Sequence, residues 1–176
     1  MGRESEVVMV LVWESARNAA RVYQKAIAGK EGNEVDPFEL ARALGVKVSV
    51  EPLKAQYSGF ISKDAGKAPE VLLQSRESYE RQRFTLAHEI GHYVERATLA
   101  DDDDFSFSDL RSTDHYDLHE FYADEFAGEL LMPKDAFVAA WMANPSLGYL
   151  ADRFAVSKAA AAKRIDRLRK TGDIAA

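Results

Sequence analysis

Two histidines and a glutamate stand close together in the segment His88-Glu89-Ile90-Gly91-His92. On a helix, residues four apart lie on one face, so both imidazole rings can reach a single ion. Glu89 lies about 100° further round such a helix and can hold a water molecule on that ion. Imidazole suits zinc, and a catalytic zinc site uses three protein ligands and leaves the fourth position to water. The spacing therefore predicts a zinc site, with Zn–N distances near 2.0 to 2.1 Å.

A third ligand must come from elsewhere, and because the chain has no cysteine it must be histidine or a carboxylate. The downstream candidates are Asp114, His115, His119, Glu120 and Asp124. Glu120 and Asp124 lie four residues apart, so Glu120 can bind the ion while Asp124 accepts the other ring N–H of a ligand histidine. Alternatively, both belong with Glu125 to the solvated face of an acidic helix. The two histidines upstream favour the metal-binding interpretation.

Apolar spacing and turn residues predict the elements that must position these groups. Helical spacing predicts helices over residues 12–28, 38–44, 78–94 and 114–131. Alternation predicts three strands, over residues 46–50, 57–61 and 70–74, which we expect to form one small sheet. Residues 100–113 are polar and are expected to form a loop. The fold class is therefore α+β.

Length and composition favour one main domain. The chain has 176 residues, 47% of them hydrophobic, and we divide it into a core, residues 1–132, and a helical cap, residues 133–176. The apolar run 7–13 is too short to span a membrane, and the residues before it lack the positive charge of a secretory signal. We therefore expect a cytoplasmic protein without a membrane partner.

The C-terminal segment resembles a helix-turn-helix, with helices expected over 147–154 and 158–168. Residues 151–176 contain seven Lys or Arg against three Asp, although the whole chain carries a net charge of -6. The segment could contact DNA, or it could only complete the fold. Its many alanines offer few side chains long enough to read base edges, so we expect a cap and no direct DNA binding.

The residues from Arg83 to His92 resemble a motif of the ImmA/IrrE family of metallopeptidases, as do several later ones. These are Glu120, Ala123-Asp124, Phe126-Ala127 and Glu129-Leu130-Leu131-Met132-Pro133. The resemblance covers roughly residues 35–135. It implies a zincin-like core with one Zn²⁺, or alternatively Mn²⁺, in each chain. The implied ligands are His88, His92 and Glu120, with Glu89 as the general base.

Family resemblance also implies a substrate, because these peptidases cut a helix-turn-helix repressor of the XRE type and relieve repression after damage or a mobile-element signal. We expect such a repressor to be encoded nearby. One position departs from the family, because many members carry a second glutamate two residues after the ligand glutamate and this chain has Tyr122 there. The four-residue spacing to Asp124 favours Glu120 as the ligand.

Peptide hydrolysis also needs a donor for the developing oxyanion, and Tyr116, His115 and His119 are available. Tyr116 precedes Glu120 by four residues and shares its face if the helix begins that early, whereas His115 would act from the loop. Each could equally be a partly buried surface residue. We expect the substrate to pair along residues 71–74 as an edge strand, unless that strand is internal.

A second interpretation comes from a different class of protein. The chain could be a regulator that binds a partner or DNA through its C-terminal helices and uses the metal only to hold its fold. Replacing Glu89 by glutamine separates the two, since the loss should abolish function in a peptidase and be harmless in a regulator.

Overall fold

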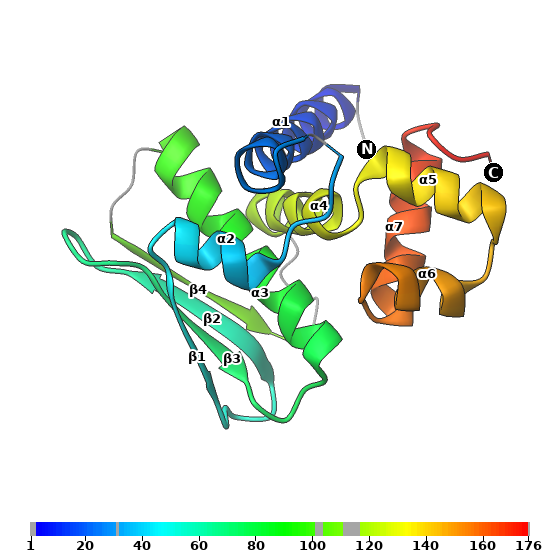
Figure 1. The fold of residues 1–176 in the computed structure, drawn as a ribbon. Coiled ribbons are helices and arrows are strands. Elements are labelled where there is room, and N and C mark those ends of the chain that lie inside the picture. Colours follow the sequence, from blue (N-terminus) through cyan, green and yellow to red (C-terminus); the bar gives the residue numbers. More distant parts are fainter. Residues whose placement is uncertain (1–2, 31, 101–103, 111–116, 176) are drawn as a thin grey trace.

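A computed structural model of the chain describes residues 3–30, 32–100, 104–110 and 117–175, and it confirms the α+β class (Figure 1). The elements follow in the order α1 (Arg3–Ala28), α2 (Pro37–Ala43), β1 (Lys47–Glu51), β2 (Tyr57–Lys63), β3 (Glu70–Gln74), α3 (Tyr79–Glu95), a π-helical turn η1 (Arg96–Ala100), β4 (Phe105–Leu110), α4 (Leu118–Leu131), α5 (Lys134–Ala143), α6 (Leu147–Phe154) and α7 (Lys158–Lys170). None of the described helices is long and apolar enough to cross a membrane.

One mixed sheet forms the first layer, and in the described residues its strand order is β1-β3-β2-β4. β1 and β3 are parallel, whereas β2 is antiparallel to both β3 and β4. The expectation of three strands was therefore too low, because β4 lies in the segment that we read as a polar loop. The expectation that residues 71–74 form an edge was wrong, because β3 has a partner on each side.

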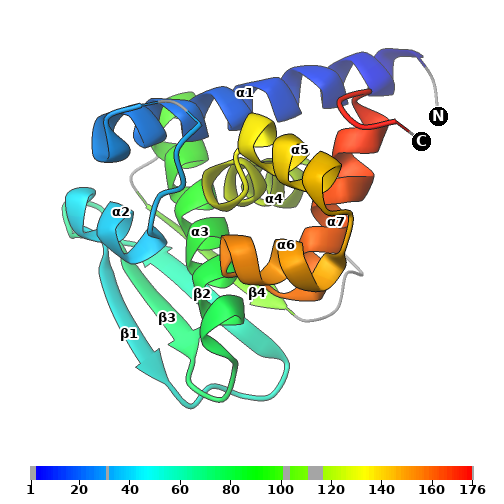
Figure 2. The same cartoon turned by 45° about the vertical axis from the view of Figure 1, so that its right-hand side comes forward.

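Helices stack on this sheet in successive layers. α3 packs on the sheet, α4 packs on α3, and α1 packs on α4 at the far side (Figures 1 and 2). A single hydrophobic cluster joins these layers, with Ile61 from β2, Ile90 from α3, Phe126 from α4 and Ala20 from α1 all fully buried. α3 and α4 thus lie side by side in the interior, which is where the predicted metal-binding residues reside.

The C-terminal helices lie at one end of the helical layers (Figure 1). α6 and α7 have the helix, turn and helix expected from the sequence. Phe154 of α6 and Leu168 of α7 are fully buried in the same hydrophobic cluster as the rest of the chain. The division into residues 1–132 and 133–176 stays a prediction.

Candidate metal centre

α3 begins at a side-chain cap and carries the two histidines on its buried part. The hydroxyl of Ser78 accepts a hydrogen bond from the backbone N–H of Arg81 at 3.3 Å, which satisfies one of the free donors of the first turn. His88 is 4% exposed, Glu89 0% and His92 1%. The HExxH segment therefore lies inside the molecule, between the sheet and α4.

α4 brings Glu120 to the same place because of where it begins. Asp117 is its N-cap, and the Oδ1 atom accepts from the backbone N–H groups of His119 at 2.9 Å and Glu120 at 3.0 Å. Glu120 consequently lies in the first turn, close to α3. The helix was expected to begin at about residue 114, whereas the structure shows α4 beginning at Leu118.

Three ligand groups converge between α3 and α4. The Nε2 atoms of His88 and His92 lie 3.1 Å apart, and they lie 3.2 Å and 3.3 Å from the Glu120 carboxylate oxygens. Ligands at 2.0 to 2.1 Å from a tetrahedral zinc ion are separated from one another by about 3.3 Å. The separations thus match three corners of a zinc tetrahedron, and the set of two imidazoles and one carboxylate could hold one such ion.

Gly91 allows the two helices to approach this closely. A Cβ atom at this position would lie 2.9 Å from the Cα atom of Ala123 and 3.2 Å from its carbonyl oxygen. Both contacts involve the backbone of α4, which cannot move aside independently of the helix. The glycine inside the motif therefore keeps Glu120 within reach of the two histidines.

Asp124 supports His88 from the side away from the convergence point. Its Oδ1 atom lies 3.3 Å from Nδ1 of His88, where a carboxylate could orient that ring if His88 binds a metal ion. Its Oδ2 atom lies 2.5 Å from Nζ of Lys163 on α7. The involvement of Lys163 could not be read from the sequence, because 39 residues separate it from Asp124.

The protonation states suit metal binding. Burial lowers the pKa of His92 to about 4, so its ring is neutral near pH 7 and has a lone pair to donate. Burial raises the pKa of Glu120, but hydrogen bonds with His88 and His92 outweigh that effect and hold the pKa at about 2. Near neutral pH the three converging groups therefore include one neutral ring and one ionised carboxylate.

Glu89 lies on the face of α3 that meets β2. A Cβ atom at Gly59 would lie 3.2 Å from Oε1 of Glu89 and 2.4 Å from Cγ2 of Thr85, so the strand can pass only because it has a glycine here. Thr85 precedes Glu89 by four residues, and helical spacing alone would have placed it on the same face. Gly59 belongs to a distant strand, and no local pattern pointed to it.

Tyr122 occupies the position at which many family members have a second glutamate. Its side chain is 1% exposed and belongs to the hydrophobic core, where it forms a hydrogen bond with Ser15 of α1. Burial, with the nearby Glu95 and Tyr23, raises its pKa to about 12. This position therefore faces α1, whereas Glu120 faces the histidines.

Of the three candidate donors to the oxyanion, the structure describes His119. His115 and Tyr116 lie outside the described residues. His119 is described, and its Nδ1 atom lies 2.9 Å from a carboxylate oxygen of Glu95 at the end of α3. Its ring thus joins the first turn of α4 to α3.

Comparison with known proteins gives the family. The sequence profile of the IrrE N-terminal-like domain, a peptidase family, matches residues 41–166, which is more than two thirds of the chain. The radiation response metalloprotease IrrE of Deinococcus radiodurans is 30% identical over 143 residues. That alignment covers 78% of this chain and 36% of the relative, so the chain spans little more than a third of the relative's length. With both motifs inside the matched region, the chain belongs to the IrrE N-terminal-like, or ImmA/IrrE, family of metallopeptidases.

Proposed function

We propose that this protein is a cytoplasmic zinc endopeptidase that makes a limited cut in a helix-turn-helix repressor of the XRE type and thereby relieves repression. The observation that carries the proposal is the convergence of His88, His92 and Glu120, with Glu89 buried beside them. Family membership supports the same chemistry. The substrate class comes from the family resemblance.

The three converging residues are the proposed ligands of one metal ion. Two imidazoles and one carboxylate favour zinc, with manganese as the alternative. When bound, zinc would polarise the scissile carbonyl and lower the pKa of a bound water towards neutrality. Asp124 would hold His88 with its Nδ1 protonated, so that Nε2 faces the ion.

Glu89 is the proposed general base. It directly follows His88 on the buried part of α3, so its carboxylate can reach a water that the ligand residues position. It would take the proton of the attacking water and deliver it to the leaving amine, so that the carboxylate returns to its ionised form. His115 and Tyr116 remain the proposed donors to the oxyanion.

We propose that the substrate adds as an extended strand to β4. Among the described strands, β4 pairs only with β2 and so presents its other edge. Gly59 of β2, which lies beside Glu89, pairs with Asp109 of β4, so that edge runs one strand away from the base. Because strand addition accepts only extended chain, a folded repressor would have to present a linker.

A regulator whose metal only holds the fold is the second candidate. Its support is that Asp124 connects His88 on α3 to Lys163 on α7, so the ligand set is built into the packing of the helices. A structural metal would serve that packing equally well. The two candidates differ in whether Glu89 is needed.

The test is to incubate the wild type and Glu89→Gln with the genomically adjacent repressor and with unfolded casein, and to map the products by mass spectrometry. We expect a single cut in the repressor, and turnover lower by two to four orders of magnitude in the variant, which is the usual range for a general base. Glu80→Gln, on the first turn of the same helix, is the matched control and should cut normally.

Three outcomes would count against the proposal. Equal cleavage by Glu89→Gln would overturn the mechanism. Extensive casein digestion without a single repressor cut would overturn the regulatory role. Intact repressor with fully zinc-loaded wild type would favour the second candidate.

A further inference from the structure

A chain of contacts runs from the surface of α7 to a proposed metal ligand. Lys163 Nζ lies 2.5 Å from Oδ2 of Asp124, and Oδ1 of the same carboxylate lies 3.3 Å from Nδ1 of His88. The lysine side chain is 47% exposed and the aspartate side chain 9% exposed. A half-exposed residue of the C-terminal segment thus contacts the carboxylate that supports a buried histidine.

The packing of α7 directs Lys163 towards Asp124. The next cations along this helix, Arg164 and Arg167, pair with Glu129 and Glu125 of α4. Asp124, Lys163 and these two arginines help to line a cavity of about 20 Å³, which has room for about one water molecule. Little solvent therefore separates α7 from the back of the site.

An aspartate held at one oxygen only can still rotate, because the terminal torsion of this side chain is broad. In this protein each oxygen has its own partner, one on α3 and one on α7. Holding both oxygens fixes the plane of the carboxylate. That plane determines how well the Nδ1–H of His88 is bound and how its Nε2 is aimed.

We propose that Lys163 is a positioning residue of the metal centre, which fixes Asp124 and through it His88, so that the C-terminal helix α7 contributes to metal affinity. This inference rests on the proposed function, because it takes His88 as a ligand. It gives the C-terminal segment a role in the metal site that requires no contact with DNA.

The experiment measures the zinc dissociation constant by competition with a chromophoric chelator, for the wild type, Lys163→Met, Lys163→Arg and Lys158→Met. We expect Lys163→Met to bind zinc about two- to five-fold more weakly, as suits a partly exposed ion pair. Lys163→Arg keeps a donor and should restore most of the affinity. Lys158→Met removes the same charge from the same helix, where no ion pair is described, and should bind as the wild type does.

Repeating the measurement in an Asp124→Asn variant distinguishes a positioning role of Lys163 from a general loss of stability. Asp124→Asn should weaken zinc binding by roughly 10- to 100-fold, and Lys163→Met should then add almost nothing, because the lysine acts through the aspartate. The absorption of bound Co²⁺ should change in Lys163→Met and not in Lys158→Met. Melting temperatures of the zinc-free proteins show whether a variant fails to fold.

Each outcome bears on one claim. Equal zinc affinity in Lys163→Met and Lys158→Met, or an unreduced effect of Lys163→Met in the Asp124→Asn background, would overturn the inference. A wild-type protein that binds no stoichiometric zinc would instead overturn the proposed function.

Discussion

α4 carries two acidic pairs with the same four-residue spacing, and the two have opposite surroundings. Glu120 and Asp124 face α3, where they meet His88 and His92. Glu125 and Glu129 are turned towards α1 and α7, where each is about 2% exposed and meets arginines. Spacing alone does not distinguish a metal site from an ionic core, because distant residues decide the outcome.

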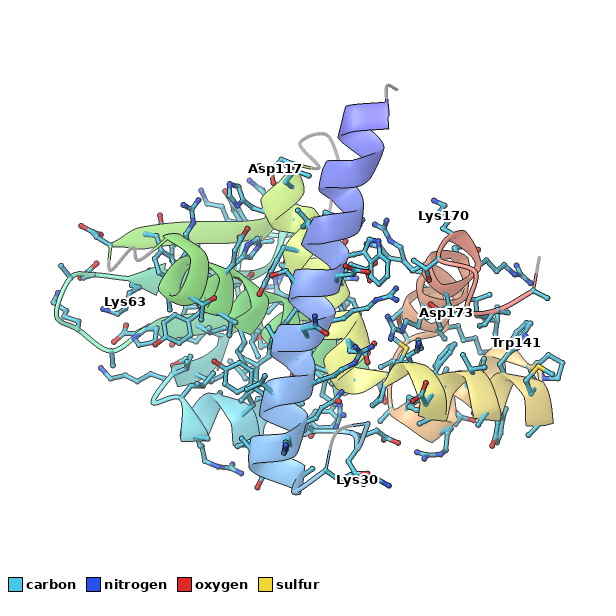
Figure 3. The ribbon with its side chains drawn as sticks, turned by 90° about the horizontal axis from the view of Figure 1, so that it is seen from above. Lys30, Lys63, Asp117, Trp141, Lys170 and Asp173 are labelled. Carbon is cyan, nitrogen blue, oxygen red and sulfur yellow. The ribbon has the colours of Figure 1, made fainter. Side chains whose placement is uncertain are left out.

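The second pair belongs to a buried charge network that joins three helices. Arg17 of α1 lies 2.9 Å from Glu125, Arg21 lies 3.2 Å from Glu129, and Arg164 of α7 pairs with Glu129. Asp173, which follows α7 and is labelled in Figure 3, extends the network towards α1 and α5 by contacts with Arg17 and Lys134. Permanently charged arginines neutralise these carboxylates, whereas the neutral ring of His92 beside Glu120 leaves the carboxylate a charge to share with an ion.

The largest expected difference between the pairs is in metal content. Glu120→Ala should lose stoichiometric zinc, measured by elemental analysis after dialysis, because two histidines alone make an incomplete site. Glu125→Gln should keep zinc in its folded fraction but melt at a lower temperature. A chelator should lower the melting temperature of the wild type and leave that of Glu120→Ala unchanged. Retained zinc in Glu120→Ala would show that the ligand is another residue.

The second prediction concerns the stability of the charge network. Arg164→Met should lower the free energy of unfolding by about 3 to 5 kcal/mol, because it leaves the buried carboxylate of Glu129 without its partner on α7. Lys170→Met removes the same charge from the exposed end of that helix and should stay within about 0.5 kcal/mol of the wild type. Denaturant titration of both variants decides the matter, and equal stabilities would mean that the network contributes little.

Sequence patterns were sufficient to predict those features of the fold and the candidate site that depend on residues close together in the chain. The HExxH spacing located the histidines, and the pair Glu120 and Asp124 was correctly assigned to one helix face, because both depend only on helical periodicity. The same periodicity does not explain Arg17, a charged residue of α1 that is only 1% exposed. Its partner Glu125 is 108 residues away, and no local pattern reveals such a pairing.

Strand pairing was the other point at which local reading failed. β4 begins with alternating phenylalanines and serines, which is itself a strand pattern, but it is short and follows the acidic run 101–104, so the whole segment was read as polar. β3 directly precedes α3, yet β1 pairs with β3 in parallel and takes its other edge. Strand order follows from contacts between distant segments, which the sequence of each strand does not contain.

The third prediction uses two helical glycines near the two acidic pairs. Gly91→Ala should lower the free energy of unfolding by about 1 to 3 kcal/mol, because the new methyl group would meet the backbone of Ala123. The variant should also bind zinc more weakly, because α3 and α4 would move apart. At Gly128 the nearest atom to a new Cβ is Nη1 of Arg164 at 3.5 Å, which is an ordinary contact. Gly128→Ala should therefore be neutral or stabilising by up to about 1 kcal/mol. Equal effects of the two changes would contradict the requirement for close helix packing at Gly91.

The smallest expected effect concerns the affinity of the protein for DNA, although the C-terminal segment is basic. Its cations are largely engaged within the protein, since Arg153 pairs with Glu34, Lys163 with Asp124, Arg164 with Glu129 and Arg167 with Glu125. The local positive charge thus balances acidic groups on α4 and near α2. We expect DNA affinity no tighter than the micromolar range of non-specific binding, with a steep loss between about 50 and 200 mM salt.

Fluorescence anisotropy of a labelled duplex measures the DNA affinity. The informative variants are Lys158→Ala, Arg169→Ala and Lys170→Ala. These residues form no described ion pair, so any phosphate contact should depend on them and weaken by a similar amount for every DNA sequence. Tight binding to one operator that survives high salt would contradict a capping role, because it would require α7 to exchange its pairs with α4 for contacts with bases. Such an exchange would also release Asp124, so zinc affinity would fall on adding that DNA. If zinc affinity stays constant while DNA is added, α7 has kept its place against α4.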